Sequence, residues 1–381
     1  MRKVKVGDII RVSKGRKAAH VTNIKIENAL RYIQIEDLRS DNILQYSLDK
    51  NGVFVDESDI CIAWDGANAG TVGYGLSGII GSTIARLRLE DKSIYTPYVG
   101  RFLQTKFHIL NGKTTGTTIP HVERSRLDNL ELSLPSFAEQ RRIAAILDKA
   151  DTIRRKRQEA LKLADDLVKS RFIEMFGDPV TNPMGWEMPC LEKLAASSKN
   201  ALKAGPFGSS LKKEDYTEKG YKIYGQEQVI KGDAFYGDYY ISEQKYNTLK
   251  SCAVSEGDVL ISLVGTYGKV LIVPHGFEPG IINPRLVKIS FDKKKINTVF
   301  FEHFFASDSL KTKLDSNTNG CTMGVLNLGI IKKINIPLPP IALQNQFAAF
   351  VEQTDKSKFA MQRQLEEAEA CKSALMQQFF N

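Results

Sequence analysis

Apolar residues recur three and four positions apart over one long stretch of the chain. From Phe137 to Phe176 there is no Gly or Pro, and this spacing places the apolar residues on one face of an α-helix. Ser136 and Glu139 match a capping box at the start, and Gly177 is a typical helix stop. A helix of this length extends about 60 Å, so we expect its apolar stripe to pack on another element.

A second helical stripe runs from Phe347 to Phe379. Neither stripe is a regular heptad, so we expect the two long helices to pack as an irregular coiled coil, which the family resemblance described below implies to be antiparallel. Charged residues on these helices allow two interpretations, either a solvated face with weak ion pairs or a docking surface for a partner subunit or DNA. The candidates for partner contact on the first helix are Arg141, Arg142, Arg154 and Arg155.

The rest of the chain has shorter, β-rich runs bounded by Gly, Asn or Asp. These runs predict strands at Lys3–Arg11, Tyr32–Leu38, Ile60–Trp64, Thr83–Leu89, Lys222–Tyr224, Asp258–Leu263, Lys269–Val273 and Ile281–Ile289. Two segments between them, Thr96–Leu110 and Thr298–Leu314, have helical spacing. The pattern therefore predicts an α+β protein in which mixed segments alternate with long helices.

One passage occurs twice. Gly116–Gln140 and Gly320–Gln344 align without a gap, and the match continues to the ends of both predicted long helices. In each copy a Leu-Pro pair is followed, after four residues, by a Gln. The chain therefore consists of two copies of one unit, each a mixed segment followed by a long helix.

The mixed segments match each other less closely than the helices do. We align Asp59–Ile62 with Asp258–Ile261 and Thr71-Val72 with Lys269-Val270. We also align Arg86-Leu87 with Arg285-Leu286. This difference is expected if the helices form a common frame while the mixed segments recognise two different targets.

Composition points to a polyanionic partner. The chain of 381 residues has a formal net charge of +9, which favours nucleic acid, although a basic protein can also lack such a partner. Its five cysteines are scattered without zinc spacing, as is typical of a reducing compartment. No apolar run approaches the roughly 18 residues of a membrane span, so we expect a cytoplasmic protein.

Catalytic motifs are not recognisable. Gly66–Gly75 and Gly265–Lys269 are glycine-rich but lack the spacing of phosphate loops, and we interpret both as turns between strands. We find no motif for a methyl donor, no nuclease-like acidic cluster common to both copies and no metal-ligand set. We therefore expect no catalytic residue and no metal site in this chain.

Basic and polar loop residues are the better candidates for a binding surface. Side chains of Lys, Arg, Ser, Thr and Asn suit both phosphate contacts and the reading of base edges. Any single one of them is more often an ordinary solvent-facing residue, so the prediction concerns the set. Its members are Lys14, Arg16, Lys17, His20, Lys113, Thr114, Thr115, Lys203, Ser209, Ser210, Lys212, Lys213, Lys311, Lys313 and Asn317, with tyrosines such as Tyr216 and Tyr239 as further hydrogen-bond donors.

Several motifs together resemble the specificity subunits of type I restriction-modification systems. The resemblance rests on Gly116–His121, Leu134-Pro135, Glu139–Ala144 and Phe176–Pro179, and more loosely on Leu338–Pro340 with Gln344. It covers essentially the whole chain. It implies target recognition domains at 1–120 and 179–324, each followed by a linking region with a long helix, at 121–178 and 325–381.

The resemblance also implies a function. Each recognition domain would read one half of a bipartite DNA site, and the helices would fix the spacer. The subunit would be non-catalytic and would recruit two modification subunits together with restriction subunits. S-adenosylmethionine, ATP and Mg would then belong to those partners. The alternatives are a methyltransferase or nuclease acting alone, or a coiled-coil adaptor without a DNA role.

Overall fold

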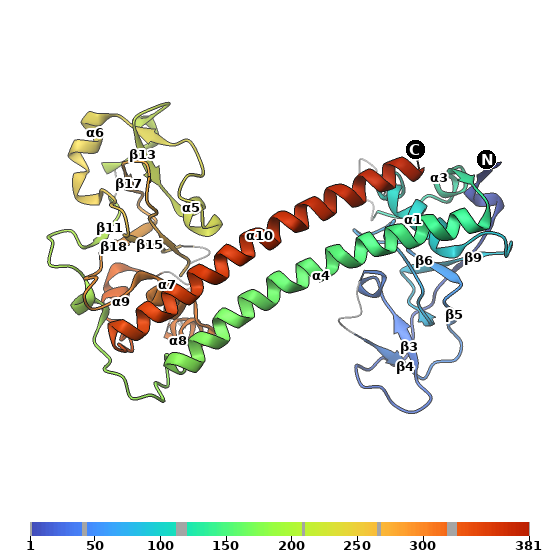
Figure 1. The fold of residues 1–381 in the computed structure, drawn as a ribbon, viewed down its shortest axis with the longest axis horizontal. Coiled ribbons are helices and arrows are strands. Elements are labelled where there is room, and N and C mark those ends of the chain that lie inside the picture. Colours follow the sequence, from blue (N-terminus) through green and yellow to red (C-terminus); the bar gives the residue numbers. More distant parts are fainter. Residues whose placement is uncertain are drawn as a thin grey trace. The chain divides into compact units, whose positions relative to one another are not determined.

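The computed structural model describes residues 2–39, 44–111, 120–207, 210–264, 268–317 and 326–380. The chain divides into two compact units. Unit 1 combines Met1–Glu159 with Gln362–Asn381, and unit 2 is Ala160–Met361. The long helices α4 (Phe137–Phe176) and α10 (Ile341–Phe380) each contribute one segment to each unit (Figure 1). The division by chain order into 1–120, 121–178, 179–324 and 325–381 stays a prediction.

Helix α4 has the predicted bounds, and both predicted end signals are present. The Ser136 hydroxyl accepts a hydrogen bond from the Glu139 backbone N–H at 3.3 Å. Gly177 adopts φ +76°, which favours glycine, and its N–H donates to the Ile173 carbonyl at 2.8 Å. Local capping therefore fixes where the helix begins and ends.

Unit 1 contains an inner and an outer four-stranded sheet. The inner sheet has the order β2-β9-β6-β7, the outer sheet β4-β3-β8-β5, and β1 pairs with β10. The strands are β1 (Arg2–Lys5), β2 (Ile10–Lys14), β3 (Leu30–Ile33), β4 (Tyr46–Ser47), β5 (Val53–Val55), β6 (Asp59–Ala63), β7 (Val72–Tyr74), β8 (Gly78–Ile80), β9 (Ile84–Leu89) and β10 (Glu131–Leu134). The short helices are α1 (Thr96–Thr105), α2 (Phe107–Leu110) and α3 (Arg124–Asp128).

The inner sheet of unit 1 is buried on both faces, which explains the unbroken apolar run of β6. Ile60 and Ile62 pack into the core shared with α1 and α4, whereas Cys61 and Ala63 pack into the core shared with the outer sheet. The inner sheet therefore stands between the helices and the outer sheet.

Unit 2 has the same plan. Its inner sheet has the order β11-β18-β15-β16 and its outer sheet β12-β14-β13-β17. The strands are β11 (Leu202–Ala204), β12 (Tyr216–Thr217), β13 (Tyr221–Tyr224), β14 (Tyr240–Ile241), β15 (Val259–Ser262), β16 (Val270–Ile272), β17 (Gly280–Ile282) and β18 (Leu286–Ile289). The helices are α5 (Gln226–Lys231), α6 (Glu243–Thr248), α7 (Thr298–Ala306), α8 (Asp308–Asn317) and α9 (Leu328–Lys332). In each outer sheet one pair is parallel, β3 with β8 and β13 with β17, so the predicted internal repeat is confirmed.

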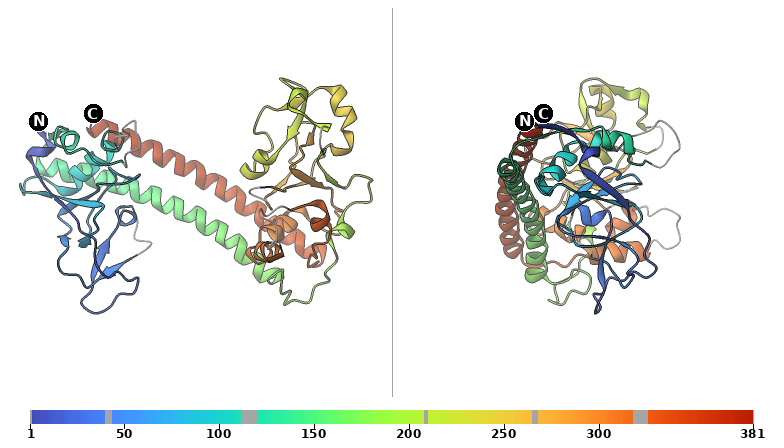
Figure 2. Two further views of the ribbon diagram at one scale, coloured as in Figure 1. Left: turned by 180° about the vertical axis from the view of Figure 1, so that it is seen from behind. Right: turned by 90° about the vertical axis from the view of Figure 1, so that its right-hand side faces the viewer.

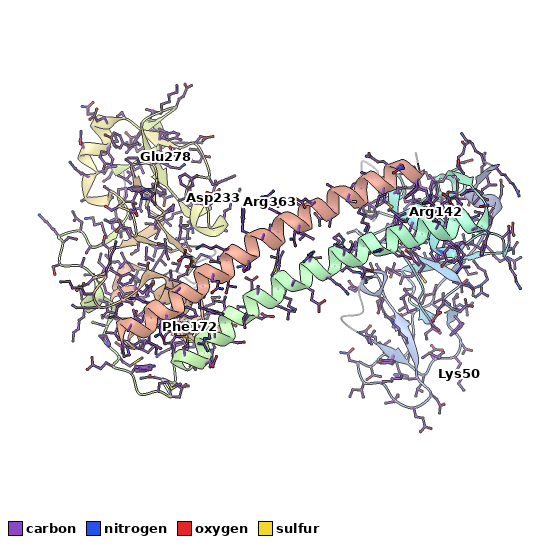
Figure 3. The ribbon with its side chains drawn as sticks, viewed as in Figure 1. Lys50, Arg142, Phe172, Asp233, Glu278 and Arg363 are labelled. Atoms are coloured by element: carbon purple, nitrogen blue, oxygen red, sulfur yellow. The ribbon has the colours of Figure 1, made fainter. Side chains whose placement is uncertain are left out.

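Segments of α4 and α10 lie side by side in antiparallel orientation within each unit (Figure 2). In unit 1 the Lys372 Nζ lies 2.5 Å from an Asp151 carboxylate oxygen. In unit 2 the rings of Phe172, labelled in Figure 3, and Phe347 lie 5.5 Å apart between centroids. The predicted stripe is only partly buried, because Leu163 and Leu167 remain 60% and 53% exposed.

Three predicted strands are shorter than expected. The segment Tyr32–Leu38 is strand only as far as Ile33, because a 3₁₀ turn at Glu36–Leu38 follows. The segment Lys3–Arg11 contains a 3₁₀ turn at Val6–Asp8, where Gly7 packs against Asp128 too closely to admit a side chain. The segment Ile281–Ile289 is split between β17 and β18 at Asn283–Arg285. Pro284 lies in that break, and proline cannot donate a hydrogen bond to a sheet.

Candidate nucleic-acid interface

The repeated glutamine fixes each long helix to its own unit. The Gln140 Oε1 accepts from the Tyr95 N–H at 2.9 Å, while its Nε2 donates to the Pro135 carbonyl at 3.0 Å. Gln344 makes the same bonds with Asn297 and Pro339, at 2.9 and 2.8 Å. Both side chains are buried, so their amides satisfy backbone groups that would otherwise lack partners.

Three loops of unit 1 meet at one end of the inner sheet, which we call the loop end of unit 1. They follow β2, follow β6 and precede β9, and the Trp64 N–H donates to the Thr83 carbonyl at 2.7 Å. Lys14 ends β2 here, with its Nζ 2.7 Å from an Asp65 carboxylate oxygen. The candidates Arg16, Lys17 and His20 follow as exposed residues.

The loop end of unit 2 is built in the same way. Loops follow β11, follow β15 and precede β18, and the Leu263 N–H donates to the Arg285 carbonyl at 3.0 Å. The candidates Ser210, Lys212 and Lys213 are exposed residues of the segment that follows β11.

Backbone hydrogen bonds show which residues correspond at the two loop ends. Trp64 bonds to Thr83 as Leu263 bonds to Arg285, so Thr83 is the counterpart of Arg285. The sequence alignment that paired Arg86 with Arg285 is therefore wrong. Strand pairing sets Arg86 opposite Cys61 in unit 1 and Lys288 opposite Leu260 in unit 2, which makes Lys288 the counterpart of Arg86.

A capped turn follows the parallel strand β3 or β13 at both loop ends. In unit 1 the Gln34 N–H donates to an Asp37 carboxylate oxygen at 2.6 Å. In unit 2 the Gly225 N–H donates to the Gln228 Oε1 at 2.9 Å. Ile35 and Gln226 therefore occupy equivalent positions, and the two units carry different side chains on one backbone frame.

Other candidates lie elsewhere. Lys203, expected on a loop, lies within β11 opposite Lys288. Lys311 and Lys313 lie on α8, and Lys311 lines a cavity of about 650 Å³ against α4 and α10 rather than the loop end. Lys113, Thr114, Thr115, Ser209 and the Asn317 side chain lie outside the described residues.

The four arginines proposed for partner contact fall into two pairs. Arg141 and Arg142 are exposed near the start of α4, and Arg142 pairs with Glu139 at 2.7 Å. Arg154 and Arg155 both approach Asp151, at 3.2 and 3.8 Å. Arg154 is the less exposed of this pair and belongs to an ion-pair network inside unit 1. Arg141, Arg142 and Arg155 are exposed and are therefore better placed for a partner than Arg154.

The cavity that contains Lys311 also contains Glu302, a residue of α7. Burial, helped by the nearby Asp355 carboxylate, raises the pKa of Glu302 to about 7. Burial lowers the pKa of the adjacent His303. Burial therefore disfavours the charged form of both side chains.

We expect Glu302→Gln to stabilise unit 2 at pH 8. A carboxyl whose folded-state pKa is raised binds its proton more tightly in the folded state, so stability falls as pH rises from about 4.5 to about 7. The free energy of unfolding should exceed that of the unmodified protein by about 1 to 3 kcal/mol at pH 8 and show little gain at pH 5.

Urea denaturation followed by Trp186 fluorescence would measure this effect, in a Trp64→Phe background that leaves one tryptophan. Glu243→Gln on α6 is the exposed control and should leave the free energy of unfolding unchanged at both pH values. An equal gain at pH 5 and pH 8 would contradict the raised pKa.

Two residues at the loop end of unit 2 were not singled out as candidates from the sequence. Gln226 opens α5, and Arg285 was assigned to a strand. The available signal was Pro284, since a proline inside an apolar run favours a break rather than a central strand.

In the described part of the chain, no group of three or more His, Cys, Asp or Glu residues is arranged to hold a metal ion. No helix among those residues is both long and apolar enough to cross a lipid bilayer.

Comparison with known proteins gives consistent results. The family described as "Type I restriction modification DNA specificity domain" matches residues 1–163 and 186–369. The type I restriction enzyme MjaVIII specificity subunit of Methanocaldococcus jannaschii is 25% identical, over 98% of this chain and 90% of its own length. The EcoBI specificity subunit of Escherichia coli is 21% identical, over 88% and 75%.

The fold also matches a solved structure. The S subunit of a type I restriction-modification system from M. genitalium superimposes with a TM-score of 0.60 at 16% identity, over 100% of this chain and 96% of that one. Together with the family match over most of the sequence, these findings show that the chain belongs to the family of type I restriction modification DNA specificity domains.

Proposed function

We propose that this chain recognises DNA for a type I restriction-modification complex. The loop end of unit 1 binds one half of an asymmetric, interrupted site, and the loop end of unit 2 binds the other half. The observation that carries this proposal is that the two loop ends share one backbone arrangement but carry different side chains. Thr83 and Ile35 in unit 1 stand where unit 2 has Arg285 and Gln226.

The helices set the spacer between the half-sites and bind the partner subunits. Buried Gln140 and Gln344 tie each helix start to its own unit, which supports a fixed relation between helix and recognition surface. Two modification subunits supply S-adenosylmethionine and methylate adenine, and restriction subunits use ATP and Mg. The chain itself supplies recognition and no catalysis, and the specificity-subunit names of its relatives support this role.

Replacing residues 1–115 with the matching segment of another family member should change one half-site only. The exchanged segment contains the loop end of unit 1 and leaves unit 2 intact. Methylome sequencing of cells that express the chimera with its modification subunits measures the result. Alteration of both half-sites would contradict the assignment of one half-site to each unit.

The alternative function is that of a methyltransferase that acts without partner subunits. Purified chain incubated with DNA and methyl donor should transfer no methyl groups, whereas the same chain with modification subunits should. Its DNA binding should weaken steeply with salt, because Lys and Arg contacts to phosphate release counterions.

A further inference from the structure

A cleft of about 320 Å³ lies at the loop end of unit 2, beside the outer sheet. Its polar lining comes from separate segments. These residues are Lys213 before β12, Tyr216 on β12, Gln226, Glu227 and Gln228 on α5, Tyr239 before β14, and Asn283 and Arg285 before β18. This is where the C-terminal ends of the parallel strands β13 and β17 meet the inner sheet. Ends of parallel strands are common ligand sites because several loops converge there.

Tyrosines and cations give this cleft hydrogen-bond donors. The rings of Tyr216 and Tyr239 meet edge to face, with 5.8 Å between centroids. Burial, and then the neighbouring Tyr239, raises the pKa of Tyr216, while the charge of Arg285 acts in the opposite direction. The Tyr216 phenol therefore keeps its proton at neutral pH.

Gln226, Lys213 and Arg285 contribute further hydrogen-bonding groups to the cleft. The Gln226 Nε2 donates to the Val264 carbonyl, which holds the side chain in place and leaves its Oε1 as an acceptor. Within the described residues, neither Lys213 nor Arg285 takes part in an ion pair, and both are exposed. The cleft thus presents an amide oxygen from Gln226 and a guanidinium group from Arg285.

Unit 1 carries different side chains at the positions equivalent to Arg285 and Gln226. Thr83 stands in the place of Arg285, and Ile35 in the place of Gln226. Because the backbone frame is the same, the difference lies in what the side chains recognise rather than in the fold. The cleft is therefore a place where the two halves of the chain differ in specificity.

We propose that this cleft reads base-pair edges of the second half-site, with Arg285 and Gln226 contacting bases and Lys213 contacting a phosphate. The proposal rests on the DNA-recognition function given above. An arginine fork matches paired acceptors in the major groove, and a glutamine acceptor matches the amino group of adenine or cytosine. Lysine contributes charge without sequence information.

The test uses the complete complex with its modification subunits. Arg285→Ala and Gln226→Ala should each relax one position of the second half-site, with roughly 10-fold to 100-fold less discrimination between the correct and the wrong base. Lys213→Ala should weaken binding equally for all sequences and reduce the salt slope of binding by about 1. Methylome sequencing and DNA binding at several salt concentrations measure these effects.

Lys294→Ala is the matched control, because Lys294 is an exposed lysine beyond the opposite end of β18. It should leave both half-sites and the salt slope unchanged. Arg285→Lys keeps the charge without the fork, so it should retain affinity and still lose discrimination. Full discrimination in the Arg285 and Gln226 variants, or a change in the first half-site, would overturn the assignment. Absence of DNA binding by the wild-type complex would instead overturn the proposed function itself.

Discussion

Replacing Phe347 with alanine is expected to reduce the free energy of unfolding of unit 2 by about 3 to 5 kcal/mol. Phe347 is fully buried, and its ring meets Phe172 and Phe176, each 5.5 Å away between centroids. It also meets the His303 ring at 5.1 Å. These contacts join α10, α4 and α7, so the cavity left by alanine opens where three helices meet.

Phe359 on the same helix provides the control, because it is 68% exposed and its replacement by alanine should cost little. Urea denaturation in the Trp64→Phe background reports on this site directly, since the Trp186 Nε1 donates to the Phe176 carbonyl at 3.1 Å. Equal effects of the two substitutions would show that the aromatic cluster does not stabilise unit 2.

Replacing Arg101 with alanine is expected to reduce the free energy of unfolding of unit 1 by about 2 kcal/mol, because it removes a buried guanidinium that pairs with two partly exposed carboxylates. Arg101 is 6% exposed, and its Nη2 lies 2.7 Å from Asp148 and 3.7 Å from Asp151. Lys372 of α10 pairs with the same Asp151. The network therefore connects α1, α4 and α10.

The pH dependence of this network has a definite sign. Burial alone would raise the pKa of Asp151, but the hydrogen bond and charge of Lys372, with the charge of Arg101, lower it to about 2. The stabilisation is therefore present above pH 4 and is lost as pH falls towards 2. Trp64 fluorescence in a Trp186→Phe background would report on unit 1.

Arg11→Ala is the control for Arg101, since the Arg11–Glu90 ion pair is largely exposed and such pairs contribute about 0 to 1 kcal/mol. A double-mutant cycle between Arg101 and Asp151 isolates their coupling. Coupling no larger than that of the Arg11–Glu90 pair would contradict a stabilising network.

The long helices and the repeat were predictable because their signals are local and strong. Phe137–Phe176 lacks Gly and Pro and carries its own cap and stop, so the predicted bounds are those of α4. Gln140 and Gln344 occupy equivalent positions of the repeat in the sequence. The structure shows that an amide is needed there because each side chain bonds to backbone groups of its own unit. The α+β class follows from these elements.

The interface residues were harder to predict because they depend on pairing between distant strands. Arg86 and Arg285 look equivalent in sequence, since each precedes a leucine, but hydrogen bonds make Thr83 the counterpart of Arg285. An inner sheet buried on both faces has apolar runs without alternation, so a shift along the sequence goes unnoticed, and Pro284 was the available signal against it. Lys203 was likewise placed on a loop although it lies within β11.

The turns capped by Asp37 and Gln228 stabilise the backbone of the loop ends, whereas other side chains are proposed to select the DNA target. Backbone hydrogen bonds hold the loop ends, whereas exposed Arg285 contributes to no core cluster. Exchanges at such exposed positions typically change the free energy of unfolding by no more than about 0.5 kcal/mol. With the proposed role of these positions in reading DNA, a lineage carrying this fold would acquire a new target by a few point mutations, without passing through an unstable intermediate.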